Sequence, residues 1–336
     1  MASSEVALDY RVMADSRQLR FLPALALWAA LVSTGLFYAV WLGYGGRALA
    51  FIAITFGALL AGEILPGAAR VTESLQRLLP APVAWLLAAP ILTAYGCYAI
   101  GTGSSAGWRW LLAVAFVLVP LALLSLREAG QPGWYDYAAI VAIAVPVKLK
   151  WIAMLWPYPD NKLAHTMSIL LAMNIAVAGF LFVRRIGEVG YAFAWTAKQT
   201  FAVCAGIVVM MVVAIPAGLA LRFLHWAPGH AGWASMPLVA LGIFFFTAWP
   251  EEFVFRGLLQ NMLSRTFKSG NAGWIVASVL FGLSHIANGF FPNWKYALLA
   301  TFAGFAYGWT WRKSGNIFAS AILHCVVDTV WHALFT

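Results

Sequence analysis

The chain contains too few charged residues for a soluble protein of its length. Charged side chains make up 10% of its 336 residues and hydrophobic ones 63%, whereas an ordinary soluble domain is about 25% charged. The same balance excludes intrinsic disorder, which requires low hydrophobicity and high charge. A run of about 20 mostly apolar residues can cross a bilayer as a helix, and such runs recur along the chain. The sequence therefore predicts an all-α, polytopic membrane helical bundle.

The charges and the Gly/Pro clusters divide the chain into about eleven transmembrane helices, within a predicted range of nine to eleven. Their limits are 21–43, 48–65, 81–101, 108–126, 137–157, 165–183, 200–221, 236–258, 273–289, 295–311 and 316–335. The fifth is the weakest, because Lys148 and Lys150 interrupt it. It could instead be two half-segments or a re-entrant piece.

The distribution of basic residues predicts the orientation. The net charge is +9, and summing Lys and Arg over alternate loops gives thirteen on one side and five on the other. Because cytoplasmic loops carry the excess of Lys and Arg, this asymmetry predicts a cytoplasmic N-terminus. The basic residues are spread singly rather than clustered on one face, so we expect no nucleic-acid partner.

Acidic residues are unevenly placed along the chain. Of the twelve, only Glu251, Glu252 and Asp328 lie after position 188, and all three fall within apolar runs, as do His285 and His324. With a helical rise of 1.5 Å per residue, these groups lie roughly 14 to 21 Å from the cytoplasmic ends of their helices. Ionisable groups inside a membrane are costly and usually functional. We therefore expect them to meet in one layer of the bilayer.

The spacing within each helix predicts local pairs. Glu252 and Arg256 are four residues apart and share one helix face, which allows an ion pair. His324 and Asp328 have the same spacing, so the carboxylate can accept a proton from the imidazole or share a ligand with it. Glu251 has no such partner, which suits a general base. The alternative is a purely structural cluster of ion pairs and hydrogen bonds between helices.

These residues form three short motifs in sequence order. Glu251 to Arg256 fits EExxxR, Phe281 to His285 fits FxxxH, and His324 to Asp328 fits HxxxN/D. In this order the motifs resemble the CPBP family, which comprises the CAAX proteases and bacteriocin-processing enzymes and is also called the type II CAAX prenyl endopeptidases. The resemblance covers about residues 236–332. The longer polar connection from about Arg184 to Lys198 divides the chain into two regions. These are an N-terminal membrane region of about six helices, 1–186, without an assigned function, and a region, 187–336, that the resemblance implies is the catalytic membrane core.

The resemblance implies an intramembrane endopeptidase that cleaves near the C-terminus of a membrane protein or lipidated peptide. Glu251 would activate the water, and His285 would help to hold and deprotonate it. His324 and position 328 would stabilise the oxyanion, while Glu252 and Arg256 would order the site. The family motif allows Asn at position 328, whose amide can donate to an oxyanion. Asp328 would instead orient His324, or stay protonated and donate.

The family has been described both as metal-dependent and as glutamic proteases. Glu251, His285, His324 and Asp328 offer oxygen and nitrogen ligands that zinc could accept. The sequence lacks an HExxH motif, however, and the four side chains come from three helices. We expect no cofactor, with a divalent metal such as zinc as the alternative.

Two other functions stay open at this point. Carboxylates in mid-membrane also occur in ion- or proton-coupled transporters, although no match between the two halves of the chain is evident. A catalytically silent homologue acting in immunity or as a chaperone is the second alternative. In each case we expect an integral multi-pass protein of a prokaryotic cytoplasmic membrane. The sequence does not predict an oligomeric state.

Overall fold

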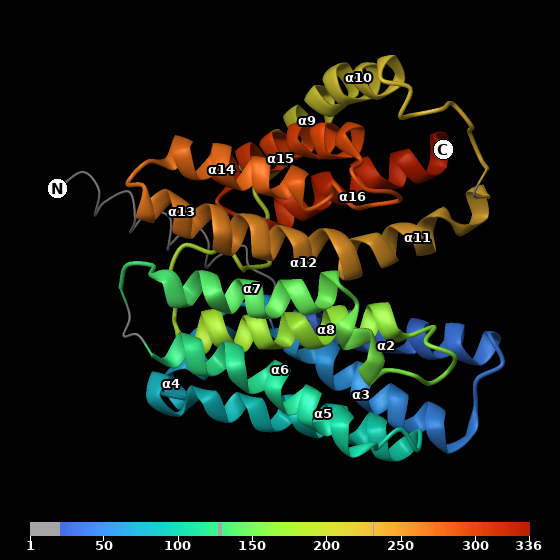
Figure 1. The fold of residues 1–336 in the computed structure, drawn as a ribbon, viewed down its shortest axis with the longest axis vertical. Helices are drawn as coiled ribbons and strands as arrows, with labels where there is room; N and C mark the ends of the chain where they lie inside the picture. Colours follow the sequence, from blue (N-terminus) through green and yellow to red (C-terminus); the bar gives the residue numbers. More distant parts are fainter. Residues whose placement is uncertain (1–20, 127–129, 231) are drawn as a thin grey trace. The chain divides into compact units, whose positions relative to one another are not determined.

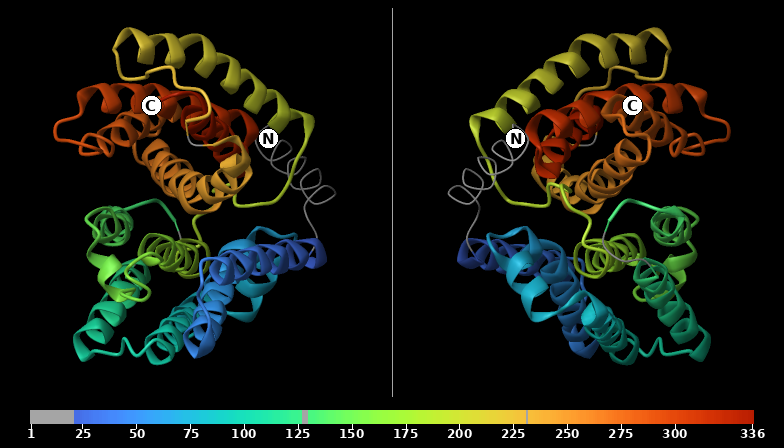
Figure 2. Two further views of the ribbon diagram at one scale, coloured as in Figure 1. Left: turned by 90° about the vertical axis from the view of Figure 1, so that its right-hand side faces the viewer. Right: turned by 90° about the vertical axis from the view of Figure 1, so that its left-hand side faces the viewer.

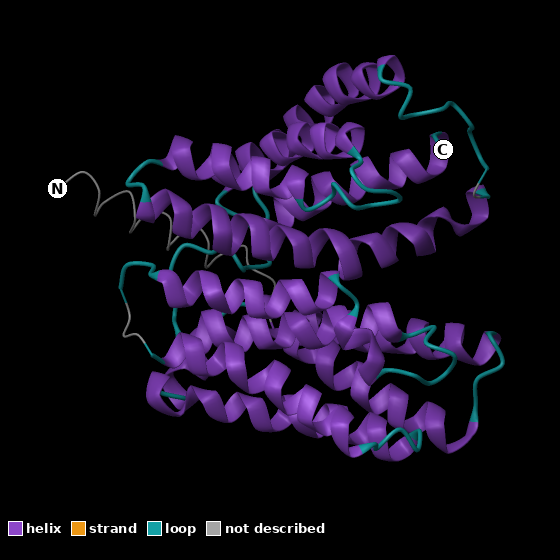
Figure 3. Ribbon diagram, in the orientation of Figure 1, coloured by secondary structure: helices purple, strands orange, loops and turns teal. Residues whose placement is uncertain are grey.

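The computed structural model describes residues 21–126, 130–230 and 232–336. Within these ranges the chain is helical and has no strands (Figures 1 and 3); an isolated bridge joins Trp226 and Phe335. The predicted all-α class is confirmed. The predicted cytoplasmic N-terminus falls on residues 1–20, outside the described residues.

The chain divides into two compact units, Met1–Gly187 and Glu188–Thr336. The helices of the first are α2 Phe21–Trp41, α3 Gly46–Ile64, α4 Val71–Leu78, α5 Ala88–Gly101, α6 Gly107–Ser125, α7 Trp134–Lys148 and α8 Ala164–Ala176. A π-helical segment, Val177–Val183, extends α8. In the most apolar 18-residue stretch of this combined helix, 83% of the residues are buried. It is therefore the packing centre of the first unit.

The second unit contains the motif residues. Its helices are α9 Ala197–Val209, α10 Ile215–Ala220, α11 Met236–Ile243, α12 Trp249–Glu252, α13 Asn261–Thr266, α14 Gly270–Leu283, α15 Trp294–Ser314 and α16 Ile317–Leu334. A π-helical segment, Met210–Ala214, joins α9 to α10, and Figure 2 shows the pair as one curved helix. Two further π-helical segments, Phe244–Ala248 and Phe253–Gln260, join α11, α12 and α13. These last three helices thus form one continuous 34-residue helix, Trp233–Thr266.

Eight helices in the described ranges are long and apolar enough to cross a membrane, so the predicted count of about eleven is not confirmed. The predicted segment 137–157 is broken, because α7 ends at Lys148 and a short 3₁₀ helix, Trp151–Leu155, follows it. The predicted limit of 289 for the ninth helix is wrong. Helix α14 ends at Leu283, and the turn-forming residues Asn288, Gly289 and Pro292 follow.

The contact between α14 and α15 depends on glycine. A Cβ added at Gly282 would lie 1.8 Å from Thr301 Oγ1 and 2.5 Å from the Ala297 carbonyl oxygen. One at Gly304 would lie 2.9 Å from the Ser278 carbonyl oxygen. Small residues let two backbones approach closely, which is how helices associate in lipid. The close approach sets the position of the end of α14, and hence of His285.

An aromatic cluster fixes the helix that carries the two glutamates. The Trp249 ring lies 4.7 Å from Phe318 at the start of α16 and 5.8 Å from Tyr191. Asn316, before α16, donates to the carbonyl oxygens of Ala192 and Ala194 at 2.8 and 3.1 Å. The connection 188–196 therefore holds α12 and α16 together next to the motif residues.

We expect Gly282→Ala to destabilise the protein by about 1 to 3 kcal/mol, because overpacking at a tight contact costs about that much. Its matched control is Gly242→Ala in α11, where an added Cβ meets nothing within 4 Å. The midpoint of thermal unfolding in detergent should fall for the first variant and not for the second. Equal midpoints would contradict the close approach of α14 and α15.

Candidate active site

Glu251 and Glu252 lie on the long helix between two π-helical segments. Pro250 precedes them and has no N–H to donate to the previous turn, which accounts for the wider turn Phe244–Ala248. Segments of π-helix occur frequently at functional sites. Both glutamates belong to the short α-helical stretch between the two π-helical segments.

The Glu252 carboxylate is fully buried and contacts three side chains. Its Oε2 lies 3.0 Å from Arg256 Nε, which is the ion pair expected from the spacing. The Ser320 hydroxyl donates a hydrogen bond to the same oxygen at 2.5 Å. The other oxygen, Oε1, lies 3.0 Å from His324 Nδ1. A buried charge is tolerated when it is paired and hydrogen-bonded, and Glu252 meets both conditions.

Aromatic rings enclose the Arg256 guanidinium. Its central carbon lies 4.4 Å from the Phe281 ring centroid and 5.5 Å from that of Tyr307. The Nη2 group donates to the Gly304 carbonyl oxygen at 3.5 Å. The ion pair therefore links the long helix to α14 and α15 and has no access to solvent.

His324 stands between two carboxylates. Its Nδ1 faces Glu252, and its Nε2 lies 3.4 Å from Asp328 Oδ2, one turn later on α16. The Tyr307 ring stacks on the imidazole at 4.6 Å between centroids. These contacts fix the plane of the ring, and they let either nitrogen donate a hydrogen bond to a carboxylate.

Glu251 faces His285 across a short gap. Its Oε2 lies 4.0 Å from His285 Nε2, which is too far for a direct hydrogen bond. His285 Nδ1 lies 2.8 Å from the Phe281 carbonyl oxygen and can only donate to it. Nε2 is then the acceptor nitrogen in a neutral imidazole. Two acceptors thus face one another across a gap that a water molecule can bridge.

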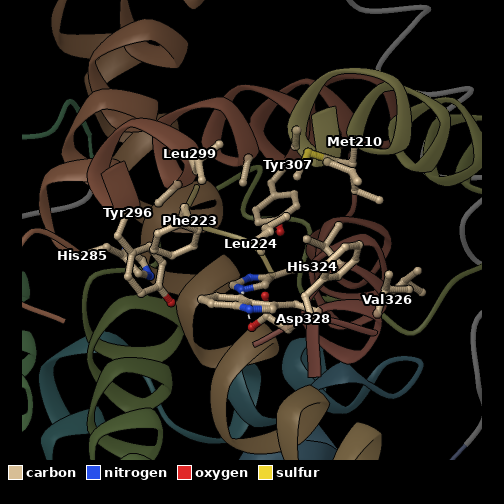
Figure 4. Close-up of a pocket in the computed structure, with 18 of the residues that line it drawn as sticks. Met210, Phe223, Leu224, His285, Tyr296, Leu299, Tyr307, His324, Val326 and Asp328 are labelled. Carbon is tan, nitrogen blue, oxygen red and sulfur yellow. Dashed lines mark ion pairs between the residues drawn. The ribbon is translucent and has the colours of Figure 1, made fainter. Parts of the chain in front are cut away.

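These groups line a cavity of about 410 Å³ in the second unit, within the range of small-molecule sites. Its polar wall includes Glu251, His285, His324 and Asp328. Figure 4 shows His285 beside Tyr296, and His324 beside Asp328. Much of the remaining wall is apolar and includes Ile207, Met210, Met211, Ala214, Leu299 and Ala303.

All six predicted site residues belong to this one region. Four of them line the cavity, while Glu252 and Arg256 lie behind it in the buried network. The sequence prediction did not include Ser320, although its position four residues before His324 on the same helix face was a usable signal. It also did not include Tyr296 and Tyr307, for which the sequence gives no signal.

The four side chains named as possible zinc ligands do not form one cluster in this structure. In the described part of the chain, no group of three or more His, Cys, Asp and Glu side chains is placed to hold a metal ion. The four candidate ligands form two separate pairs, and both nitrogens of His324 already face carboxylates.

We expect Glu252→Ala to destabilise the protein by about 3 to 5 kcal/mol, because it leaves the Arg256 charge buried without a partner. The control is Glu188→Ala, which removes an ion pair with Arg265 in which the Glu188 side chain is 86% exposed. Exposed pairs contribute about 0 to 1 kcal/mol. The measurement for both variants is the midpoint of thermal unfolding in detergent. Equal falls in this midpoint would show that the buried pair of Glu252 and Arg256 contributes no more stability than the exposed pair of Glu188 and Arg265.

One comparison with known proteins gives a match that covers the motif residues. Residues 232–330 match the family model described as type II CAAX prenyl endopeptidase Rce1-like. No curated protein and no solved structure gives a significant match. The matched segment contains all six site residues. The eight long apolar helices in the described ranges support an integral multi-pass membrane protein. Residues 232–330 are thus similar to the type II CAAX prenyl endopeptidases, which confirms the resemblance to the CPBP family.

Proposed function

We propose that the protein is an endopeptidase that hydrolyses a peptide bond near the C-terminus of a membrane protein or lipidated peptide. The observation that carries the proposal is the pair formed by Glu251 and His285 at the cavity wall. Glu251 Oε2 is buried and has no hydrogen-bond partner among the described residues. A buried unsatisfied oxygen calls for a water molecule, and here that water would also contact His285 Nε2.

The bridging water is the nucleophile in this mechanism. Its oxygen adds to the scissile carbonyl carbon while the Glu251 carboxylate accepts one of its protons. His285 holds the water through Nε2, because Nδ1 is engaged with the Phe281 carbonyl oxygen. The water is therefore oriented by one acceptor and deprotonated by the other.

His324 stabilises the product of this addition. The electron pair of the carbonyl moves to its oxygen, which becomes an oxyanion, and His324 donates to it from Nε2. Asp328 orients the imidazole from one side and Glu252 from the other. When the intermediate collapses, the C–N bond breaks and the proton held by Glu251 passes to the leaving amine.

Glu252 and Arg256 position the side chains of the cavity wall and do not contact the substrate. Both are buried and neither lines the cavity. Ser320, which contacts Glu252 and lies 2.9 Å from the Tyr307 carbonyl oxygen, belongs to the same support. We further propose that the reaction needs no metal, since this set of residues supplies the base, the water-binding group and the oxyanion donor.

We expect Glu251→Gln to lower the cleavage rate by about 100- to 10,000-fold, the range that a general base contributes. The variant keeps the shape of the side chain, which is one-third exposed, so the midpoint of thermal unfolding should not change. The measurement is cleavage of membrane-protein substrates, identified by comparing C-terminal fragments in membranes with the wild-type protein and with the variant. Full activity of the variant would end the assignment of Glu251 as base.

We expect strong chelation to leave the cleavage rate of the purified protein unchanged, because no step requires a metal ion. The measurement compares the rate before and after incubation with a chelator, followed by addition of single divalent metals. A loss of activity that one metal restores would overturn the metal-free mechanism while leaving the endopeptidase function intact.

A further inference from the structure

Tyr296 occupies a position in the cavity that the mechanism above does not use. It belongs to the first turn of α15 and lines the cavity together with Glu251, His285 and Asp328. Its side chain is partly exposed, whereas that of Tyr307, the other cavity tyrosine, is buried. A substrate in the cavity can therefore reach the Tyr296 hydroxyl.

The loop before α15 holds Tyr296 in place. The Tyr296 N–H donates to Asn293 Oδ1 at 3.1 Å, and Asn293 Nδ2 donates to the Asn288 carbonyl oxygen at 2.9 Å. The Asn288 side chain hydrogen-bonds the Tyr296 hydroxyl. Backbone and side chain of Tyr296 are thus both tied to the loop that follows His285.

Three rings fix the orientation of the phenol. The Tyr296 ring centroid lies 5.1 Å from that of His285 and 5.3 Å from those of Trp331 and Phe223. Figure 4 shows Tyr296 and His285 side by side. These aromatic neighbours restrict the Tyr296 ring to a position in the cavity wall beside His285.

An oxyanion formed in this cavity would be stabilised by a neutral hydrogen-bond donor. An oxyanion needs hydrogen-bond donors, but Glu251 and an ionised Asp328 only accept. His324 Nε2 already faces Asp328 at 3.4 Å, so its proton is shared. Where the family motif has Asn at position 328, an amide can donate; this chain has Asp there. The Tyr296 hydroxyl is a neutral donor in the wall of the same cavity as Glu251 and Asp328.

We propose that Tyr296 is a further catalytic residue, whose hydroxyl donates a hydrogen bond to the oxyanion, and that Asn288 is its positioning residue. This inference rests on the proposed function. The phenol keeps its proton throughout. It stabilises the negative charge after the water adds to the carbonyl carbon, and the bond weakens again when the carbonyl re-forms and the amine leaves.

The test is Tyr296→Phe, which keeps the ring and removes only the hydroxyl. Losing one oxyanion donor typically lowers kcat by about 100- to 1,000-fold, and we expect a loss in this range with little change in KM or in thermal unfolding. The matched control is Tyr38→Phe in α2, a tyrosine of the first unit. It should leave kcat unchanged.

Asn288→Ala tests the positioning role. Alone it should lower kcat by about tenfold, a smaller effect than loss of the donor itself. In the Tyr296→Phe background it should have no further effect, because residues that act through one another are not additive. A purely structural role for Asn288 would instead lower kcat by the same factor in both backgrounds, which would overturn the positioning assignment.

The possible outcomes distinguish the assignment of Tyr296 from the proposed endopeptidase function. If the wild-type protein cleaves and Tyr296→Phe retains full kcat, the Tyr296 assignment is wrong and the endopeptidase function stands. If the wild-type protein and Glu251→Gln both fail to cleave any membrane substrate, the proposed function and this inference fall together. A loss of kcat in Tyr296→Phe accompanied by a lower unfolding midpoint also contradicts the assignment.

Discussion

The buried charge of Glu252 is the constraint on which the second unit depends. A carboxylate out of reach of water must be paired and hydrogen-bonded, and here Arg256, Ser320 and His324 together meet that requirement. These partners come from two helices, and the rings that cover Arg256 come from two more. Satisfying one charge therefore brings four helices to a common point and orients His324 toward the cavity.

The adjacent glutamate has the opposite environment. Glu251 reaches the cavity, is one-third exposed, and faces His285 without touching it. The one-residue offset between the two acids turns them to different sides of the helix, since successive residues lie about 100° apart. One acid can thus support the structure while the other is left for chemistry. The short α-helical stretch between two π-helical segments keeps this offset.

Parts of the site could be predicted because they are local. Glu252 with Arg256, and His324 with Asp328, are four residues apart, so helix geometry alone places each pair on one face. The link between the pairs was not predictable. His324 Nδ1 contacts Glu252 across 72 residues of sequence, and no periodicity encodes a contact between two helices. Tyr296 was not predicted for the same reason, because its position beside His285 depends on how the loop after α14 folds.

The sequence by itself determined the environment and the class of the fold. Scarce charge and long apolar runs require a membrane helical bundle, since buried backbone groups must bond within their own helix. The ordered motifs indicated the family. Only the tertiary structure decided where helices end and which groups meet: α14 stops before His285, and α7 stops at Lys148. Hydropathy indicates which segments can lie within lipid. Helix ends and contacts between helices depend instead on packing, such as the close approach of α14 and α15 at Gly282.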